Sequence, residues 1–427
     1  MKKAKVLVIG GGHIQLPLIE EGVKMGVEVF VVDDRDGIID PALAERIQRV
    51  PFNRHDKKSI VEYASAHAFD AIVSAGSDRS IKLMAECAAQ CGVNTYLSEE
   101  SAALPLDKLR MAALLRAADL PAPRYDFVES YEQAASLAEA LGYPVVVKPV
   151  DGTGQEGVGA AADPEQLKSV VKSAMNASVK SRAIIQEFVE GVEYSLSGFI
   201  YRGQIAPFIA SYRGSPSRTE AGFGVALTKQ YPTDLPAELL DQLRADMETA
   251  LQQMGVDTAP FFAQVIVTSS HANQYRIIEV MPRIGGGEEA RFVRAATGFN
   301  LAKATLLAAL GWDFNVDDLV DAHGNNAVLL RFFTTENGVL KSIDGLDEAQ
   351  SLEGVREVKI YPRIGDTVTS LNDSNDRAGY LMTVGATQAE AERVSALATA
   401  KVRLEVEAVV NDETARGHAP VINQADK

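Results

Sequence analysis

The stretch YRIIEVMPRIGGGEEA, residues 275–290, determines how the rest of the sequence is interpreted. An apolar run brings one acid, Glu279, and is followed by Arg283 and by three consecutive glycines at 285–287. An acid and an arginine four residues apart suit a metal-held polyphosphate beside a developing negative charge. Glycine lets the backbone approach a ligand closely because it carries no side chain. The stretch therefore indicates one end of a nucleotide site, and three further pieces of such a site lie upstream.

The composition restricts the class of protein. A chain of 427 residues is too long for one ordinary core, and about three domains are expected. Hydrophobic residues make up 46% and charged residues 23%, as in a globular protein. The net charge of −16 argues against a nucleic-acid or anionic-membrane partner, because both favour basic surfaces. The expected partners are small molecules, with a homodimer as the default oligomeric state.

The compartment is inferred from the cysteines and the apolar runs. Cys87 and Cys91 cannot build a disulfide framework, which favours a reducing compartment. No apolar run approaches the ~18 residues that a membrane-spanning helix needs. MKKAK leads directly into an apolar run without the cleavage pattern of a signal peptide. A cytoplasmic location is therefore expected.

The first part of the chain alternates strands and helices. Apolar runs at 4–9, 27–32 and 71–74 are separated by helical segments, which predicts a parallel, doubly wound sheet. This first domain is expected to end near residue 104.

The glycines after the first apolar run suggest a dinucleotide site. Gly10 and Gly12 fit the first two glycines of the fingerprint, and Asp33 lies at a suitable distance. Gln15, however, stands where the third glycine belongs. A strand-to-helix turn without a dinucleotide is favoured, and a dinucleotide-dependent oxidoreductase is the alternative.

A second piece of the nucleotide site surrounds Lys148, which ends a valine-rich strand and precedes the loop DGTGQEGVG. A lysine at a strand end is well placed to neutralise phosphate oxygens. The lysine precedes the glycines and no G-K-[ST] follows, so this is not a Walker A loop. A flexible turn beside a solvated lysine is the alternative. Backbone N–H groups could cradle terminal phosphates at Gly152, Thr153, Gly154 and Gly157.

Two more pieces lie on later strands. The segment QEFV, 186–189, ends a strand whose backbone can meet an adenine edge, and Glu193 can bind ribose hydroxyls. Gln264 and Glu279 lie on strands that are adjacent if residues 269–273 form a hairpin. Oxygen ligands on neighbouring strands suit Mg²⁺, which takes few protein ligands plus substrate phosphates. The alternatives are a surface acidic turn for the first piece, and an isolated glutamine with a structural acid for the second.

In combination these pieces resemble the ATP-grasp ligases. The resemblance covers roughly residues 100–312 and rests on Lys108, Lys148, GTGQEGV, QEFVEGVE, Gln264, Glu279 and PRIGGG. It implies an α/β ATP-grasp fold with an N-terminal Rossmann-like parallel-sheet domain and a C-terminal α+β domain. The implied domains are 1–104, 105–318 with a lid subdomain at about 120–195, and 319–427.

Residue roles follow from the resemblance, which also implies ATP and Mg²⁺ as cofactors, with Mn²⁺ as an alternative ion. Lys108 and Lys148 match the phosphate-binding lysines. The loop that closes over the phosphates matches Gly152, Thr153, Gly154, Gly157 and Val158. The adenine hinge and the ribose acid match Glu187, Phe188, Val189 and Glu193. The metal ligands match Gln264 and Glu279. The resemblance implies that Arg283 stabilises the acyl-phosphate, together with the N–H groups of Gly286 and Gly287.

Two positions depart from the family pattern. Gln264 stands where most members have an acid, although carbamoyl phosphate synthetase resembles this sequence in using glutamine there. Met281 stands where many members have a metal-binding asparagine, and a thioether is a poor Mg²⁺ ligand. Phosphate chemistry is therefore better supported than the number of metal ions.

A narrower resemblance concerns the substrates. IIEVMPRIGGG, ATGFNLAKATLLAALG and the stretch RAGYLMTVGATQAEAE at 377–392 are similar to L-amino acid ligases, which make dipeptides. This resemblance implies that ATP phosphorylates a carboxylate and that an amine then displaces phosphate. Two alternatives stay open, namely a ligase or carboxylase acting on a purine intermediate or bicarbonate, and a nucleotide-binding module without catalysis.

Substrate contacts are expected from several loops. The segment 211–225 carries charged candidates, for which a solvated loop is the alternative, at Arg213, Arg218 and Glu220. Asp78 lies at the carboxyl end of a strand in the first domain, where ligands of such sheets bind. Glu288 is placed to orient an attacking amine, and His13 follows a strand-end turn. One helix is expected from the glycines to near Trp312, and the last hundred residues carry few candidate catalytic groups.

Overall fold

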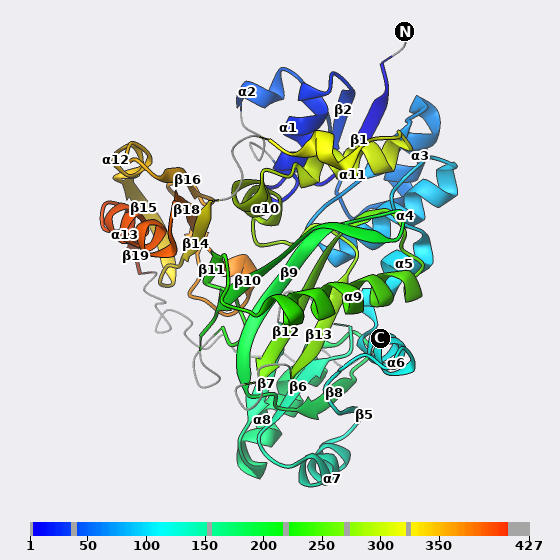
Figure 1. The fold of residues 1–427 in the computed structure, drawn as a ribbon, viewed down its shortest axis with the longest axis vertical. Helices are drawn as coiled ribbons and strands as arrows, with labels where there is room; N and C mark the ends of the chain where they lie inside the picture. Colours follow the sequence, from blue (N-terminus) through cyan, green and yellow to red (C-terminus); the bar gives the residue numbers. More distant parts are fainter. Residues whose placement is uncertain are drawn as a thin grey trace, which may run out of the picture.

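The computed structural model describes residues 3–35, 41–151, 156–216, 222–268, 274–321 and 326–408. Within these ranges the chain forms four sheets, and a large central sheet lies between an N-terminal body and a smaller body at the opposite end (Figure 1). None of the helices in these ranges combines the length and the apolar character needed to cross a membrane. This arrangement confirms the predicted α/β class.

The N-terminal body is a four-stranded sheet in the order β3-β2-β1-β4, with parallel pairing throughout. Its strands are β1 (Lys5–Ile9), β2 (Glu28–Val32), β3 (Gln48–Val50) and β4 (Ala71–Val73). The helices that alternate with them are α1 (Leu16–Lys24), α2 (Pro41–Ala44), α3 (Lys57–His67) and α4 (Asp78–Cys91). Strands β1 and β2 are buried along almost their whole length, as in parallel sheets covered on both faces. The predicted parallel sheet is confirmed.

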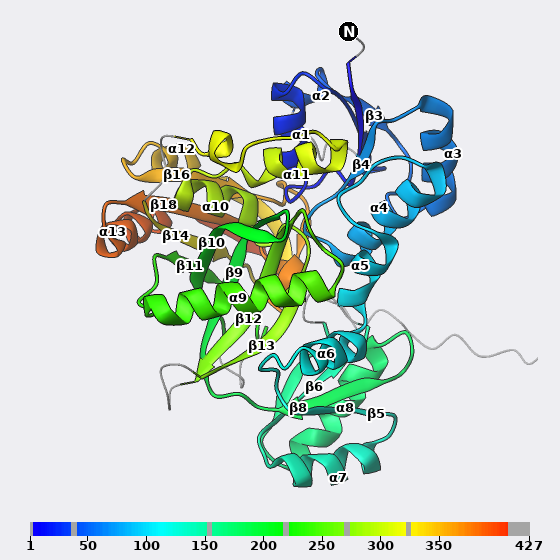
Figure 2. The same ribbon diagram turned by 45° about the vertical axis from the view of Figure 1, so that its right-hand side comes forward.

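A smaller antiparallel sheet in the order β5-β8-β6-β7 forms the body at the opposite end (Figure 2). Its strands are β5 (Tyr125–Val128), β6 (Val145–Pro149), β7 (Gly159–Ala161) and β8 (Ala183–Glu187). Helices α7 (Tyr131–Leu141) and α8 (Pro164–Ala177) pack against it. Its buried side chains, such as Val147 and Leu167, form a core separate from the main one. A body with its own core is suited to move as a unit.

The central sheet has eight strands in the order β13-β12-β9-β10-β11-β14-β18-β16, and its neighbours are antiparallel. Five strands come from the middle of the chain, β9 (Gly191–Tyr201), β10 (Gln204–Gly214), β11 (Thr228–Tyr231), β12 (Ala259–Thr268) and β13 (Tyr275–Met281). Three come from the C-terminal part, β14 (Ala327–Phe333), β16 (Val355–Ile360) and β18 (Gly379–Gly385). The β11–β14 pairing therefore carries the central sheet into the C-terminal part. Helix α9 (Ala237–Gln253) lies along the sheet (Figure 2).

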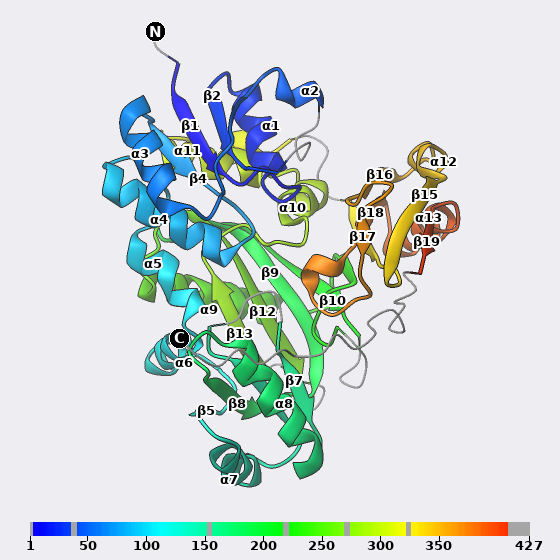
Figure 3. The same cartoon turned by 180° about the vertical axis from the view of Figure 1, so that it is seen from behind.

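The remaining elements connect these bodies or cover their edges. Between the N-terminal and smaller bodies lie α5 (Glu99–Ala103), the short 3-10 helix η1 (Leu104–Leu106) and α6 (Lys108–Ala117). A three-stranded sheet in the C-terminal part contains β15 (Gly338–Asp344), β17 (Thr367–Val368) and β19 (Arg403–Glu407) (Figure 3). The other helices of this part are η2 (Val316–Leu319), α12 (Leu346–Gln350), η3 (Ser374–Asp376) and α13 (Gln388–Thr399).

The single helix expected between the glycines and Trp312 is wrong. The structure has two helices, α10 (Glu289–Thr297) and α11 (Leu301–Leu310). Gly298 ends the first in a left-handed conformation with φ +78°, where a side chain would also collide with the carbonyl of Asp321. Asn300 then caps the second helix by accepting a hydrogen bond from the Lys303 N–H at 3.0 Å. Helix α11 packs against α1, which fixes the N-terminal body to the central sheet.

Candidate active site

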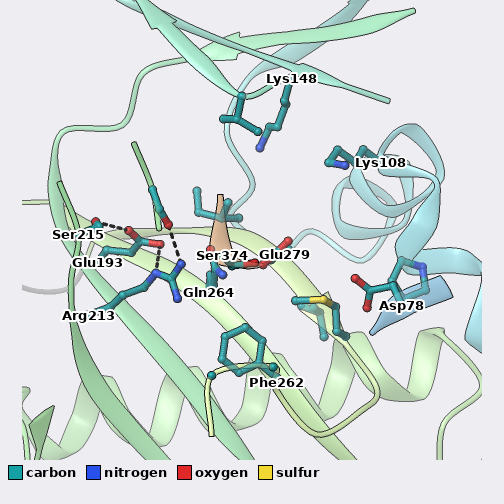
Figure 4. Close-up of a pocket in the computed structure, with 18 of the residues that line it drawn as sticks. Asp78, Lys108, Lys148, Glu193, Arg213, Ser215, Phe262, Gln264, Glu279 and Ser374 are labelled. Atoms are coloured by element: carbon teal, nitrogen blue, oxygen red, sulfur yellow. Dashed lines mark hydrogen bonds and ion pairs between the residues drawn. The ribbon is translucent and has the colours of Figure 1, made fainter. Parts of the chain in front are cut away.

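A cavity of about 820 Å³ lies where the bodies meet. Its lining includes Asp78 from the N-terminal body, Lys148 from the small sheet and Glu279 from the central sheet. It also includes Tyr361 and Arg377 from the C-terminal part. Residues that are far apart in the sequence therefore share one chamber (Figure 4).

Two lysines occupy one end of this cavity. Lys148 lies on β6 and Lys108 is the first residue of α6. The Lys108 N–H donates to the carbonyl of Val150 at 3.2 Å, which fixes the start of α6 beside the end of β6. Figure 4 shows both side chains directed toward the space above Glu279. The chain thus presents two ammonium groups to one ligand volume.

Burial makes this end of the cavity receptive to negative charge. Burial, reinforced by the charge of Lys108, lowers the pKa of Lys148 to about 8. Burial also lowers the pKa of Lys108, while Glu279 and Asp78 oppose the change. A polyanion bound here would place further negative charge beside both ammonium groups.

Glu193 and Arg213 form an ion pair on the cavity wall. Arg213 Nε lies 2.9 Å from Glu193 Oε1, and Ser215 Oγ lies 3.4 Å from Glu193 Oε2 (Figure 4). Arg213 Nη2 donates to the carbonyl of Gly224 at 2.7 Å. Burial raises the pKa of Glu193, and Arg213 opposes that rise. Arg213, which was expected to contact the substrate, is therefore held by Glu193, which was expected to bind the ribose.

Gln264 and Glu279 face each other across β12 and β13, as predicted from their strands. Both line the cavity, and Gln264 is buried. Within the described residues no three His, Cys, Asp or Glu side chains cluster as metal ligands. One carboxylate and one amide oxygen fit Mg²⁺, which takes most of its ligands from phosphate and water. The thioether of Met281 does not add a metal ligand, because its sulfur lies 2.6 Å from Arg283 Nη2.

Arg283 is held by the N-terminal body. Its Nε forms an ion pair with Asp78, the first residue of α4, and its Nη1 donates to the Ile284 carbonyl at 3.1 Å. The Gly76 N–H donates to the same carbonyl at 3.1 Å. The loop after β4 and the segment after β13 are therefore joined by a charged pair and a backbone bond.

The glycine run permits this close approach. A Cβ on Gly286 would lie 2.9 Å from the carbonyl oxygen of Gly76. Gly286 and Gly287 both line the cavity, and α10 begins at Glu289, after the N-cap residue Glu288. Their backbone N–H groups thus lie near a helix N-terminus, which favours negative charge.

The N-terminal body and the C-terminal part meet at Glu288. His13 Nδ1 lies 2.6 Å from Glu288 Oε1, and the Tyr361 hydroxyl donates to the same oxygen at 2.7 Å. The His13 and Tyr361 rings stack with centroids 3.8 Å apart. Burial pushes the pKa of Glu288 up, but the bond from His13 holds it below its ordinary value. His13 and Tyr361 line the cavity, whereas the Glu288 carboxylate lies behind them.

Lys229 is a cavity residue that sequence reasoning missed. It lies on the short strand β11, is almost fully buried, and forms an ion pair with Glu289. Its ammonium group lies 5.4 Å from the centre of the Phe262 ring. No motif surrounds it in the sequence, so pairing between β11 and its neighbours is what brings it to the site.

The last hundred residues, which were expected to carry few candidate catalytic groups, contribute four side chains to the cavity lining. Tyr361, Ser374, Asn375 and Arg377 all line the cavity. They reach it because β14 continues the central sheet and places β16, η3 and β18 beside it. The signal in the sequence is the stretch that begins at Arg377, whose similarity to L-amino acid ligases assigns no role to single residues.

The other predicted residues divide into three groups. Val158, Phe188 and Val189 line the cavity. Glu187 instead directs its carboxylate to Arg124 Nε, 2.6 Å away, and Gly157 packs where a Cβ would lie 2.6 Å from Ala177 Cβ. Residues outside the described ranges are Gly152, Thr153, Gly154, Arg218 and Glu220.

The acid of the broken dinucleotide fingerprint is engaged within the N-terminal body. Asp33 is fully buried, accepts from the Gly11 N–H at 2.9 Å, and pairs with Arg35 at 2.7 Å. Its carboxylate is thus used to hold the turns at the ends of β1 and β2. This arrangement favours a structural turn over a ribose contact.

Comparison with known families agrees with this geometry. An ATP-grasp domain model matches residues 106–287, and a model of L-amino acid ligase C-terminal domain 2 matches residues 331–407. The chain therefore contains a segment that matches the ATP-grasp domain family. Its C-terminal match extends the similarity to the L-amino acid ligases.

The individual proteins that resemble this chain share about a quarter or less of its sequence. The N-terminal section of the carbamoyl phosphate synthase large chain from Methanopyrus kandleri is 25% identical over 72% of this chain. This chain spans less than three fifths of the length of such curated relatives, 57% in that case. An L-amino acid ligase from Bacillus licheniformis superposes with a TM-score of 0.78 and 18% identity, over 95% of this chain and 99% of that one.

A second similar structure contains a nucleotide. The biotin carboxylase domain of the Hydrogenobacter thermophilus 2-oxoglutarate carboxylase was solved with MgADP and bicarbonate. It superposes with a TM-score of 0.76 and 17% identity, over 95% of this chain and 91% of that one. These likenesses establish the ATP-grasp fold.

Proposed function

We propose that the chain is an ATP-dependent carboxylate–amine ligase that acts on two amino acids. The observation that carries this proposal is one cavity lined by Lys108, Lys148, Glu279 and Arg283. ATP would phosphorylate one carboxylate, and the amine of the second substrate would then displace phosphate, releasing ADP and Pi. Positioning and charge stabilisation dominate such a reaction, because the protein forms no covalent bond.

The lysine end of the cavity would hold the nucleotide. Lys108 and Lys148 would neutralise its phosphates, the latter from the end of β6. Gln264 and Glu279 would hold Mg²⁺, which would offset phosphate charge when bound. Phe188 and Val189 line the side on which adenine would lie. The small sheet, with its own core, would close over the nucleotide and exclude water.

The other end would hold the reacting carboxyl group. Arg283 would face the developing negative charge on the acyl oxygen, in an orientation set by Asp78. The N–H groups of Gly286 and Gly287 would donate to the same oxygen. His13, fixed by Glu288, would face the attacking amine.

The test is stimulated ADP release. The protein is incubated with ATP and Mg²⁺ and with pairs from a panel of common amino acids, and products are identified by mass spectrometry. We expect ADP release to require one carboxylate and one amine, with a dipeptide formed in equal amount. Turnover that depends on bicarbonate would contradict the proposal that the chain makes dipeptides. Tight ATP binding without any turnover stimulated by an acid or an amine would contradict it as well.

A further inference from the structure

Arg377 differs from the other buried arginines of the cavity. Arg213 is paired with Glu193, and Arg283 with Asp78. Arg377 is only 9% exposed, yet within the described residues its guanidinium makes no ion pair, and its buried Nε has no hydrogen-bond partner. Its positive group lies 4.1 Å from the centre of the Phe332 ring.

The charges of Glu288 and Asp373 act on Arg377, but neither carboxylate forms an ion pair with it within the described residues. Burial, reinforced by Arg213, lowers the pKa of Arg377 to about 10, so the guanidinium remains charged near neutral pH. Burying an unpaired guanidinium costs free energy that a folded protein recovers only when an anion meets it. Ser374 and Asn375 line the cavity next to Arg377 in the sequence and supply further polar groups.

The proposed reaction leaves one anion without a partner. One carboxylate is activated near Arg283, but the amine-bearing amino acid keeps its own carboxylate throughout. A guanidinium presents a planar fork of donors that matches a carboxylate with two hydrogen bonds. Arg377 reaches the cavity from the C-terminal part of the chain, whereas Lys108 and Lys148 reach it from α6 and β6.

We propose that Arg377 anchors the free carboxylate of the amine-bearing substrate on the C-terminal wall of the cavity. This inference rests on the proposed ligase function for the identity of the substrate. A phosphomonoester could offer the same charge to a guanidinium, and the experiment therefore includes one.

The experiment compares wild-type protein with Arg377→Met and Arg377→Lys, and uses Arg393→Met on the exposed face of α13 as a matched control. Calorimetry measures binding of an amino acid, its carboxamide and ribose 5-phosphate in the presence of ADP and Mg²⁺. Steady-state kinetics then gives KM and kcat for the amine-bearing substrate.

We expect wild-type protein to bind the amino acid about 10- to 100-fold more tightly than its carboxamide, because a charge-assisted pair is lost in the amide. Arg377→Met should abolish this preference and raise KM for the amine-bearing substrate by a similar factor. The KM for ATP should not change. Arg377→Lys should retain part of the preference, and Arg393→Met all of it.

The opposite results are equally clear. An unchanged preference in Arg377→Met, or Arg377-dependent binding of ribose 5-phosphate in place of the amino acid, would overturn the proposal. A lower thermal midpoint in Arg377→Met than in Arg393→Met, without ligand, would identify Arg377 as a structural group and would also overturn it. Carboxylate binding that depends on Arg377 without any ligation would refute the ligase function and leave the anchor standing.

Discussion

The two ends of the cavity are built in different ways. At the end where we propose that the nucleotide binds, Lys108 begins helix α6, and Lys148, Gln264 and Glu279 lie on strands within recognisable sequence segments. At the substrate end, His13, Tyr361 and Arg377 come from opposite ends of the chain and meet only because the central sheet joins the bodies. In the proposed reaction the first end would bind the nucleotide, and the opposite wall would select the substrates that are ligated.

The largest effect is expected at Lys148. Lys148→Ala removes a buried charge that would meet phosphate, and we expect kcat/KM for ATP to fall by about 100- to 1000-fold. The measurement is ADP release at varied ATP concentration. Lys172→Ala, an exposed lysine on α8, is the matched control and should behave as wild type. If kcat/KM for ATP in Lys148→Ala stayed within a factor of three of wild type, Lys148 would not be a phosphate-binding residue, and this end of the cavity would not be the nucleotide site.

The next effect concerns the ion pair between Asp78 and Arg283. Asp78→Asn removes the negative charge that pairs with Arg283 but keeps the size and shape of the side chain at position 78. We expect kcat to fall about 10- to 100-fold, with a smaller change in KM for ATP, because Arg283 would lose its orientation toward the acyl oxygen. Steady-state kinetics separates the two constants. An equal loss in ATP affinity and no loss in kcat would mean that Asp78 serves the nucleotide end instead.

The pH dependence should locate the charge at the nucleotide end. The pKa of Lys148 is about 8 in the free protein, and only its protonated form attracts phosphate. As pH rises through this value the ammonium group is lost, so kcat/KM for ATP should decline by about tenfold per pH unit on the alkaline side. Lys148→Arg stays protonated and should flatten this limb. An identical alkaline limb in both proteins would assign it to another group.

The smallest effect is expected from the metal site. Met281→Asn would add an oxygen donor near Gln264 and Glu279 and release the sulfur contact to Arg283. We expect half-maximal activation at an Mg²⁺ concentration a few fold lower than in wild type (on the order of 1 kcal/mol). The measurement is ADP release against free Mg²⁺, with Met281→Leu as the control that adds no donor. A Met281→Leu variant that shifts equally would show that packing, and not coordination, sets the metal requirement.

The sequence predicted the fold class and the strands that carry the proposed nucleotide-binding residues. Both predictions rest on local properties, namely the spacing of apolar residues and the residue types at strand ends. The pairing of Gln264 with Glu279 followed from a hairpin of neighbouring strands. The helix break at Gly298 was missed although its signals are local, namely a left-handed glycine that ends α10 and an Asn300 cap that begins α11. Lys229 and Arg377 were missed because their roles depend on which strands pair with β11 and β14, and on no nearby motif.

The most direct test of the ligase account follows the oxygen atoms of the activated carboxylate. The protein is given ATP, Mg²⁺ and an amino-acid mixture whose carboxylates carry ¹⁸O, and the released phosphate is analysed by mass spectrometry. If the carboxylate is activated by phosphorylation, each phosphate released in a ligation turnover carries one ¹⁸O atom. Phosphate without the label, released at the same rate, would mean that water attacks ATP directly and would contradict the account.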